Sequence, residues 1–346
     1  MTDNEIEGRT TMRLAVKLLT RALVLAVALV TAGIASAQQS VVLYSANDDT
    51  VNKLVADGFA KATGIRVDVV STGSGVLARR IASEAANPQG DVIWGVSATL
   101  LRLMSPHLQA YPVQGREAVP AEFRDPGDLW IGTNIQVVVI GQNTKSIEKS
   151  AGPKSWADLI DPKWKGKLAF TDPANSGFSY GAATTLLALW GDNDAAWTRI
   201  GTLLANAKVL NRSTQVFDGN GSGEYPLGIA LEYAGLLWAH NGAPVIAVYP
   251  SEGTHGFVEG AAVLKGGPNA DNARKLVDYL ASKETQEMLL KATFRRPARQ
   301  DIDLAAIAPD MPPLSSIKLL PYDDAKWDAV RRDTLAKLKT TIQNTR

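Results

Sequence analysis

Short β-branched runs alternate with longer helical patterns from residue 41 onward. Residues 41–44, 65–70 and 91–94 have the composition of buried strands. Residues 48–62 and 74–86 repeat apolar side chains at helical spacing, and the second of these patterns stops at an Asn-Pro pair. This β-α-β-α-β series predicts an α/β protein with a parallel sheet covered by helices.

A second set of elements follows a long β-branched run at residues 131–140. Further elements are expected at residues 167–170, 176–190, 216–221, 226–231, 245–248, 257–264, 269–282, 285–291 and 323–342. We place two extended crossings near residues 131–136 and 250–258. They predict two α/β lobes joined by two hinge strands, with the ligand cleft between the lobes.

The first predicted lobe is therefore discontinuous and comprises residues 38–132 plus 257–300. The second lobe comprises residues 133–256. Residues 301–346 form a C-terminal helical segment, and its pattern does not decide on which lobe it packs.

The first 37 residues have the pattern of a cleaved signal peptide. A basic region at residues 13–21 precedes an apolar run at 22–30 that is too short to span a bilayer, and Ala-Ser-Ala at 35–37 is a small-residue cleavage site. Met12 is an alternative start, and an uncleaved signal anchor is the alternative interpretation. We expect export to the periplasm, with a mature chain that begins at Gln38.

The charge balance and the cysteine and histidine content argue against several kinds of site and partner. The first 37 residues carry four of the 36 basic and three of the 35 acidic residues, so 32 of each sign remain in the mature chain. This balance argues against a nucleic-acid partner. The chain has no cysteine, and its three histidines are widely spaced, so we expect no disulfide, no metal site and no cofactor.

The loop at residues 71–75 follows one predicted strand and opens the next predicted helix. Such a loop presents free backbone N–H groups at the positive end of a helix, which suits an anion. We expect Thr72, Gly73, Ser74 and Gly75 to bind the anionic group of a ligand. Two alternatives are a plain helix cap and a G-x-G-x-x-A dinucleotide loop. For the second, the nearest acid begins the following strand instead of ending it.

Several segments occur in an order that resembles one family. They are LYSAN (43–47), STGSG (71–75), NPQGDVIWG (87–95), SWADLIDPKWKGKLAF (155–170), GEYPLGIALEYA (223–234) and VYPSEGT (248–254). Together they resemble bacterial extracellular solute-binding proteins of ABC importers, in the branch that binds ferric iron, 2-aminoethylphosphonate and sugar phosphates or phosphoglycerate. The resemblance implies a two-lobe periplasmic-binding-protein fold of the type II-like kind, whose lobes close on a small ligand and then dock on an inner-membrane permease, without catalysis. We expect the protein to be a monomer.

A second anion loop is expected in the opposite lobe. It spans residues 171–180 and contains Asp172, Ser176 and Ser179, and the serines are good N-cap types. Simple capping is the alternative interpretation. Two helix N-termini facing each other across one cleft would suit an anionic ligand.

Strand ends supply further candidates, because open α/β sheets bind ligands at the carboxyl ends of their strands. Ser45 and Asn47 follow the first strand, and Trp94 ends the third and is expected to wall the pocket. Asn134 lies on the first crossing strand and faces the cleft or the hinge backbone. Ordinary core packing is the alternative for Trp94.

Glu232 and Tyr233 follow the strand at residues 226–231. Ferric-iron members of the resembled family commonly have two adjacent tyrosines near this place, and a histidine or acid from the first lobe; here the pair is Glu-Tyr and the first strand end has no histidine. We therefore rank a small organic anion, a phosphonate such as 2-aminoethylphosphonate or a sugar phosphate, above ferric iron. Glu232, Asp172 or Asp218 would pair with an ammonium group or accept hydrogen bonds from sugar hydroxyls.

Three remaining features are given plain interpretations. The segment at residues 218–223 resembles the start of a calcium loop but lacks the closing glutamate, so we interpret it as a glycine-rich turn. His255 is interpreted as a solvated loop residue, with a place in the lining of the cleft as the alternative. The arginines at 295, 296 and 299 are interpreted as a solvated basic face, and the alternatives are that they neutralise ligand charge or dock on the permease. An exported hydrolase is the rival function, but the chain lacks G-x-S-x-G, cysteine and clustered histidines.

Overall fold

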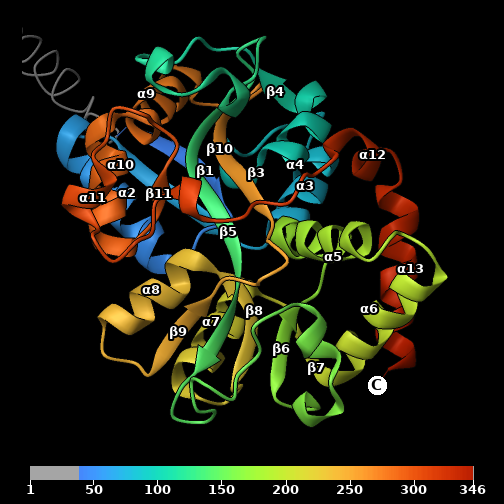
Figure 1. The fold of residues 1–346 in the computed structure, drawn as a ribbon. Helices are drawn as coiled ribbons and strands as arrows, with labels where there is room; N and C mark the ends of the chain where they lie inside the picture. Colours follow the sequence, from blue (N-terminus) through green and yellow to red (C-terminus); the bar gives the residue numbers. More distant parts are fainter. Residues whose placement is uncertain (1–38, 346) are drawn as a thin grey trace, which may run out of the picture. The chain divides into compact units, whose positions relative to one another are not determined.

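The computed structural model describes residues 39–345, so the predicted signal peptide lies outside the described residues. The strands are β1 (Ser40–Ser45), β2 (Arg66–Ser71), β3 (Val92–Ser97), β4 (Leu108–Gln109), β5 (Ile131–Asn143), β6 (Leu168–Thr171), β7 (Ala207–Leu210), β8 (Leu227–Leu231), β9 (Val245–Val248), β10 (Gly256–Leu264) and β11 (Arg296–Pro297). The helices are α2 (Asp49–Thr63), α3 (Ser74–Ser83), α4 (Ala98–Leu103), α5 (Gly177–Leu189), α6 (Asp194–Asn206), α7 (Ser213–Ser222), α8 (Glu232–His240), α9 (Ala270–Ala281), α10 (Lys283–Thr293), α11 (Leu304–Ile307), α12 (Asp324–Ala329) and α13 (Arg331–Asn344). The predicted α/β class is confirmed (Figure 1).

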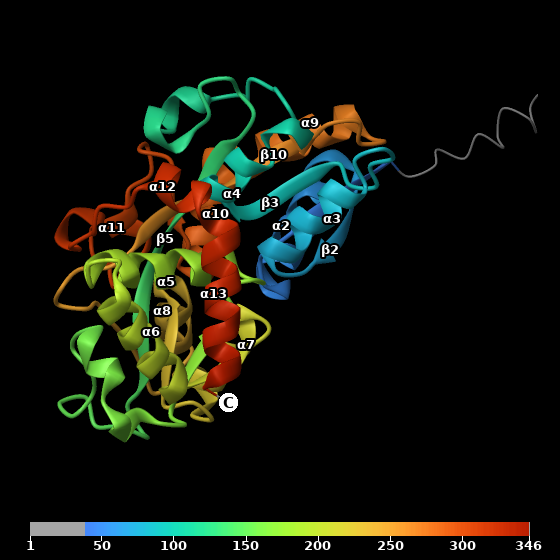
Figure 2. The ribbon, with the colours of Figure 1, turned by 90° about the vertical axis from the view of Figure 1, so that its right-hand side faces the viewer.

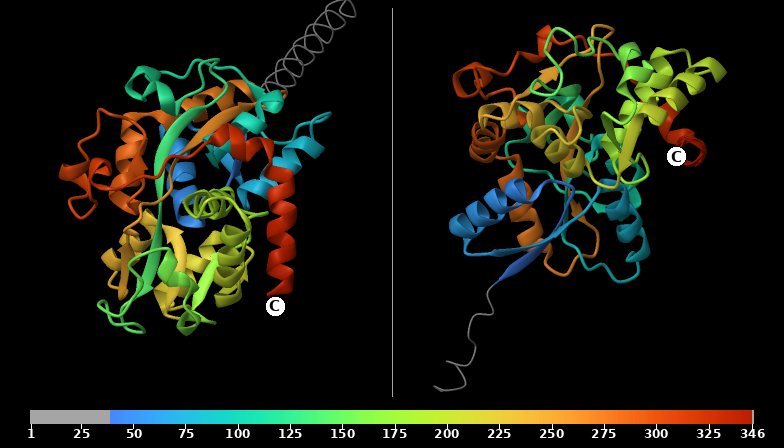
Figure 3. Two further views of the ribbon diagram at one scale, coloured as in Figure 1. Left: turned by 45° about the vertical axis from the view of Figure 1, so that its right-hand side comes forward. Right: turned by 90° about the horizontal axis from the view of Figure 1, so that it is seen from below.

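The strands form two groups that share β5. The strand order is β2-β1-β3-β10-β5-β8-β6-β7. Residues 131–137 of β5 pair with β10, and residues 138–142 pair with β8. In Figure 3 the long green strand accordingly runs from one group of elements into the other. We call the β1–β2–β3–β10 side the first lobe and the β6–β7–β8–β9 side the second lobe; the residue boundaries given above stay a prediction.

Each lobe contains parallel strand pairs. β1 pairs in parallel with β2 and β3, and β6 pairs in parallel with β7 and β8. β10 runs antiparallel to both β3 and β5, so the returning chain closes the first lobe beside the crossing strand.

Both faces of the first-lobe sheet are buried, which explains its continuous apolar strands. Side chains alternate from Val92 to Trp94, so that Val92 and Trp94 pack with α2 and α9 while Ile93 packs with α3 and α4. A bulge at Gly95 breaks this alternation and puts Val96 on the same side as Ile93. The second lobe has one large apolar cluster, which includes the inner faces of α5 and α6.

The C-terminal helix predicted at residues 323–342 is two helices, α12 and α13, separated at Val330. α13 lies alongside α6, and its Leu338 and Ile342 are buried in the second-lobe cluster (Figures 1 and 2). Asp324, at the start of α12, pairs with Arg102 of α4 at 2.8 Å. The C-terminal segment therefore contacts both lobes. No helix within residues 39–345 has the length and apolar character needed to cross a bilayer.

The expected glycine-rich turn at residues 218–223 is wrong for residues 218–222, which continue helix α7, and only the C-cap Gly223 turns the chain. Two of the glycines accommodate aromatic rings instead of turning the chain. A Cβ on Gly219 would lie 2.4 Å from the ring of Tyr225, and one on Gly221 would lie 2.5 Å from that of Trp238. Glycine therefore lets bulky side chains approach the helix backbone here.

Candidate functional site

One pocket lies where several helices begin. The N-cap residues of α2, α3, α4, α5, α7 and α8 all line it, and they are Asp48, Gly73, Ser97, Ser176, Arg212 and Leu231. Every helix N-terminus leaves backbone N–H groups without intrahelical acceptors and carries partial positive charge. Their convergence makes the pocket favourable for an anion.

Hydroxyl and amide groups cover the wall near these helix ends. The polar residues of this wall are Thr72, Ser74, Ser97, Asn175, Ser176, Asn211, Ser213 and Thr214. Ser176 Oγ and Ser213 Oγ are 3.2 Å apart, which brings the starts of α5 and α7 together. Arg212 adds a guanidinium group to the lining. The wall is thus rich in donors that an oxyanion could accept.

The two loops predicted to bind an anion meet at this pocket. The backbone N–H of Gly177, in the second lobe, donates to Ser74 Oγ at 2.9 Å. The N–H of Gly75 donates to the carbonyl of Asn175 at 3.4 Å, and Arg79 donates to the carbonyl of Ala174 at 3.1 Å. The lobes are therefore in direct contact along one edge of the pocket.

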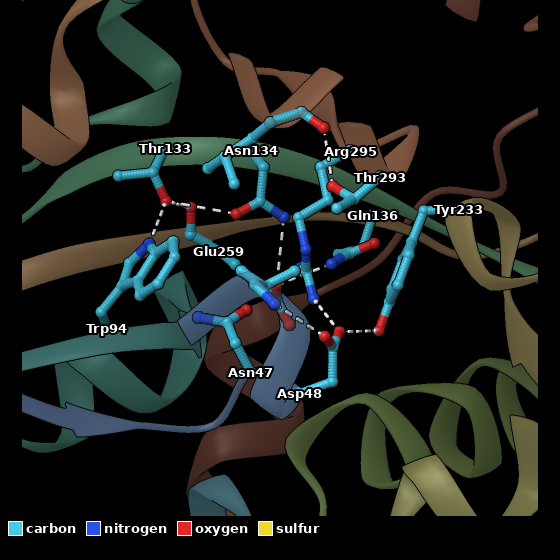
Figure 4. A network of polar contacts seen from close by, with 12 residues as sticks. Asn47, Asp48, Trp94, Thr133, Asn134, Gln136, Tyr233, Glu259, Thr293 and Arg295 are labelled. Carbon is cyan, nitrogen blue, oxygen red and sulfur yellow. Dashed lines mark hydrogen bonds and ion pairs between the residues drawn. The ribbon is translucent and has the colours of Figure 1, made fainter. Parts of the chain in front are cut away.

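A network of charged residues forms another part of the lining (Figure 4). The Arg295 guanidinium donates to Asp48 Oδ2 at 3.3 Å, and its Nη1 lies 3.6 Å from Glu259 Oε2. Its Cζ is 4.2 Å from the centroid of the Tyr233 ring, a cation–π distance. The Tyr233 hydroxyl donates to Asp48 Oδ2 at 3.4 Å. These side chains come from both lobes and from the segment that follows α10.

Glu259 is fixed by two amides of the crossing strand. Gln136 Nε2 donates to Glu259 Oε2 at 2.7 Å, and Asn134 Nδ2 donates to the same oxygen at 3.0 Å. Burial raises the pKa of Glu259, although Arg295 and the two amides lower it in part. Burial also raises the pKa of Tyr233, so its hydroxyl is held in the neutral form.

The structure brings some of the residues expected from the sequence to this pocket. Those that line it are Asn47, Thr72, Gly73, Ser74, Ser176 and Tyr233. The others lie outside its lining, and they are Ser45, Gly75, Trp94, Asn134, Asp172, Ser179, Asp218 and Glu232. Gly75 and Asn134 are nevertheless one contact away, through Asn175 and Glu259.

Most of the residues outside the lining have other partners. Ser45 Oγ accepts from the backbone of Asn47 at 3.1 Å, and Trp94 Nε1 donates to Thr133 Oγ1 at 3.1 Å inside the core. Asp172 accepts from the backbone N–H of Ala174 and so shapes its own loop.

Glu232 and Ser179 are buried apart from the pocket. Glu232 forms a 2.8 Å ion pair with Arg296 and accepts from the Tyr249 hydroxyl at 2.6 Å. The hydroxyl of Ser179 has no hydrogen-bond partner among residues 39–345. Asp218 lies on α7.

Two sequence interpretations are wrong. Arg295 and Arg296 are 3% and 4% exposed instead of forming a solvated face, because distant acids reach them. His255 is also buried; it stacks on Phe257, and burial lowers its pKa to about 4. Asp48 was not singled out in the sequence analysis, although it is an N-cap type at the start of the helical pattern over residues 48–62. Nothing local to the arginines marked their buried partners.

The sequence of this chain matches a known protein family over more than half of its length. The family model described as "Bacterial extracellular solute-binding protein" matches residues 101–327. The chain belongs to that family. Solute-binding proteins of this kind bind small ligands and work with ABC permeases, and the two-lobe fold expected from the sequence is confirmed by the structural neighbours.

Three relatives of this solute-binding protein have names or titles that mention a ligand. The putative 2-aminoethylphosphonate-binding periplasmic protein of Salmonella paratyphi A is 28% identical over 74% of this chain and 76% of its own. Iron uptake protein A1 of Synechocystis is 28% identical over 77% of this chain and 78% of its own. The structure of the periplasmic binding protein AfuA from Actinobacillus pleuropneumoniae, with fructose 6-phosphate bound, has a TM-score of 0.81 and 28% identity, and the match covers 89% of this chain and 99% of that one.

The relatives therefore include proteins named for quite different ligands. Within residues 39–345, no group of three or more His, Cys, Asp or Glu side chains could hold a metal ion. The oxygen-bearing residues that do converge in this solute-binding protein, Asp48, Glu259 and Tyr233, surround the guanidinium of Arg295.

Proposed function

We propose that this protein captures a small organic anion in the periplasm, as a monomer, and delivers it to an ABC permease without catalysing a reaction. The ligand carries a phosphate or phosphonate group. The convergence of helix N-termini and hydroxyls on one wall of the pocket is the observation that carries this proposal. Backbone N–H groups and hydroxyls are suited to the several acceptor oxygens of such a group.

The proposed mechanism is closure of the lobes on the ligand. Ser74 at the start of α3 and Ser176 before the start of α5 lie on opposite lobes and line the same pocket. An anion between them gains contacts from both lobes only when these approach, so it shifts the population toward the closed form. The permease would then bind the closed form.

Two relatives support this choice of ligand class. One is named as a 2-aminoethylphosphonate-binding protein, and the AfuA structure has fructose 6-phosphate bound. Their ligands share a tetrahedral phosphorus oxyanion and differ in the remainder of the molecule. We therefore expect the helix N-termini and hydroxyls that line the pocket to bind the phosphorus oxyanion that these two ligands share.

Ferric iron is the competing ligand, because Iron uptake protein A1 is also a relative. Ferric iron prefers anionic oxygen donors. In this pocket burial raises the pKa of Tyr233, which disfavours the phenolate, and Arg295 places a positive charge beside Asp48. We therefore place an organic anion ahead of iron. A purified protein that takes up chelated ferric iron and becomes coloured would reverse that order.

Thermal unfolding with candidate ligands tests the proposal. Inorganic phosphate, 2-aminoethylphosphonate and fructose 6-phosphate are the probes, and acetate is the control anion. A ligand at about 100 times its Kd stabilises the folded protein by roughly 2.7 kcal/mol, so binding raises Tm. A rise with at least one phosphorus oxyanion and none with acetate is expected, together with no turnover of the bound compound.

A double variant tests the assigned wall. Replacing Thr72 and Ser74 by alanine removes two hydroxyls from the lining, and we expect the Kd for the probe that binds to rise at least about tenfold. Thr198→Ala is the matched control, because its hydroxyl lies on the exposed side of α6 and donates to the Asp194 carbonyl. Equal affinities for the double variant and the control would contradict the site assignment.

A further inference from the structure

Two arginines line the pocket, and their charges have different surroundings. The Arg295 guanidinium lies beside two carboxyl groups, 3.3 Å from Asp48 and 3.6 Å from Glu259. Arg212, in contrast, forms no ion pair with any carboxylate among residues 39–345. The positive charge of Arg295 is balanced within the protein, so the charge that remains available to an anion in this pocket is that of Arg212.

The backbone of Arg212 is fixed at the end of the pocket where the helices begin. Arg212 is the N-cap residue of α7, and its N–H donates to Gln215 Oε1 at 3.0 Å. Its neighbours Asn211, Ser213 and Thr214 also line the pocket. The arginine therefore belongs to the wall of helix N-termini and hydroxyls.

The side chain of Arg212 reaches from the second lobe to the first. Its Nη2 donates to Ser71 Oγ at 3.4 Å, and Ser71 Oγ donates to the carbonyl of Asn47 at 3.2 Å. Ser71 ends β2 and directly precedes residues 72–74, which line the pocket at the start of α3. The guanidinium thus lies between the start of α7 and the loop that opens α3.

Most of the hydrogen-bonding capacity of this guanidinium is unused. The bond to Ser71 is the only hydrogen bond that the Arg212 side chain makes within residues 39–345, whereas a guanidinium has five N–H donors. Its planar fork can hold two oxygens of a phosphate or phosphonate at once. The side chain is exposed, so it can turn toward an anion without breaking a buried interaction.

We infer that Arg212 binds the phosphorus oxyanion directly and, through its contact with Ser71, couples that binding to the approach of the two lobes. This inference rests on the proposed function and names the residue of that site that recognises the negative charge. Since the contact is with the phosphorus group, loss of the guanidinium weakens every phosphorus ligand by a similar factor, whatever the rest of the ligand is.

The variant Arg212→Gln tests the inference, because glutamine removes both the charge and the fork. Calorimetric titration of the purified protein at pH 7 uses inorganic phosphate, 2-aminoethylphosphonate and fructose 6-phosphate as probes. For each probe that binds to the wild type, we expect the Kd to rise at least about tenfold, by factors that agree within about threefold. Arg212→Lys keeps the charge without the fork, and we expect a smaller rise of at least about threefold.

Arg79→Gln is the matched control, because Arg79 is also exposed and also crosses between the lobes. It donates to the carbonyl of Ala174 at 3.1 Å but does not line the pocket. If Arg212 served only as a bond between the lobes, both variants would lose affinity equally. We expect a loss below about threefold for Arg79→Gln.

Salt dependence gives a second measurement of the charge. Salt screens exposed charges, so raising the ionic strength from about 0.01 M to about 0.15 M should weaken binding to the wild type more than binding to Arg212→Gln. Equal salt dependence in the two proteins would overturn the inference.

The other outcomes separate this inference from the proposed function. If a phosphorus probe binds to the wild type, the inference fails when Arg212→Gln keeps its affinity, when Arg79→Gln loses as much, or when the losses differ widely among the probes. The proposed function stands in all three cases. If no probe binds to the wild type, the proposed function fails and the inference fails with it. Should Arg212→Gln not fold, an unchanged affinity in Arg212→Lys would overturn the inference.

Discussion

At the scale of single residues, the acids in and near the pocket have two different roles. Asp48 and Glu259 line the pocket, whereas Glu232 is committed to Arg296 and Tyr249. Glu232 and its arginine are 2% and 4% exposed, and two nitrogens of the guanidinium reach the carboxylate. Such a buried pair becomes strongly destabilising when one partner is removed, because the other charge remains buried.

We therefore predict that Glu232→Gln lowers the free energy of unfolding by about 3–5 kcal/mol and changes the ligand affinity of the folded protein less than about threefold. Urea unfolding followed by circular dichroism measures the first quantity. Asp301→Asn is the control, because Asp301 is the exposed partner of Arg299, and its loss should cost at most about 1 kcal/mol. A Glu232 variant with normal stability but weak binding would show that the carboxylate serves the ligand.

Residue chemistry also explains which part of the site was predictable. Thr72, Gly73 and Ser74 follow a strand and open a helix, so their place in the pocket lining could be expected from local pattern alone. Arg295 could not be assigned this way. Its partners Asp48 and Glu259 lie 247 and 36 positions away, and only the folded sheet brings them together.

At the scale of elements, the sequence pattern predicted β1, β3 and β8, which are short and largely buried apolar runs. It did not predict β7, whose residues are less buried. Helices α7 and α8 were not anticipated as helices. α7 contains Gly219 and Gly221, which disfavour a helix locally but allow Tyr225 and Trp238 to pack against it. Tertiary packing therefore overrides local propensity in this part of the second lobe.

This interpretation makes a prediction for two helix glycines. Gly221→Ala should destabilise the protein by about 1–3 kcal/mol, because the new Cβ would lie 2.5 Å from the Trp238 ring. Gly201→Ala on α6 should instead stabilise it by about 0.5–1 kcal/mol, since its Cβ would meet only Thr341 at 3.7 Å. Thermal or urea unfolding of both variants measures the difference. If Gly221→Ala also stabilised the protein, close ring packing would not be the reason for glycine in α7.

At the scale of the whole molecule, the contact between the lobes depends on small residues at the start of α3. A Cβ on Gly73 would lie 2.3 Å from the carbonyl oxygen of Asn175, and one on Gly75 would lie 2.5 Å from that of Ala174. Gly73 has φ −61°, which any residue adopts, so glycine is not required here by the local backbone. The clash arises only when the two lobes are together.

We predict that Gly73→Ala leaves the stability of the ligand-free protein within about 0.5 kcal/mol of wild type but weakens ligand binding at least about tenfold. The alanine raises the free energy of the closed form alone, and about 1.4 kcal/mol of such a rise lowers affinity tenfold. Small-angle X-ray scattering should show a decrease in radius of gyration on ligand addition for the wild type and for Gly201→Ala, and a smaller decrease for Gly73→Ala. If all three proteins had equal affinity and became equally compact, ligand capture would not require the close approach of Gly73 to Asn175. The lobes would then have to close through contacts at other residues.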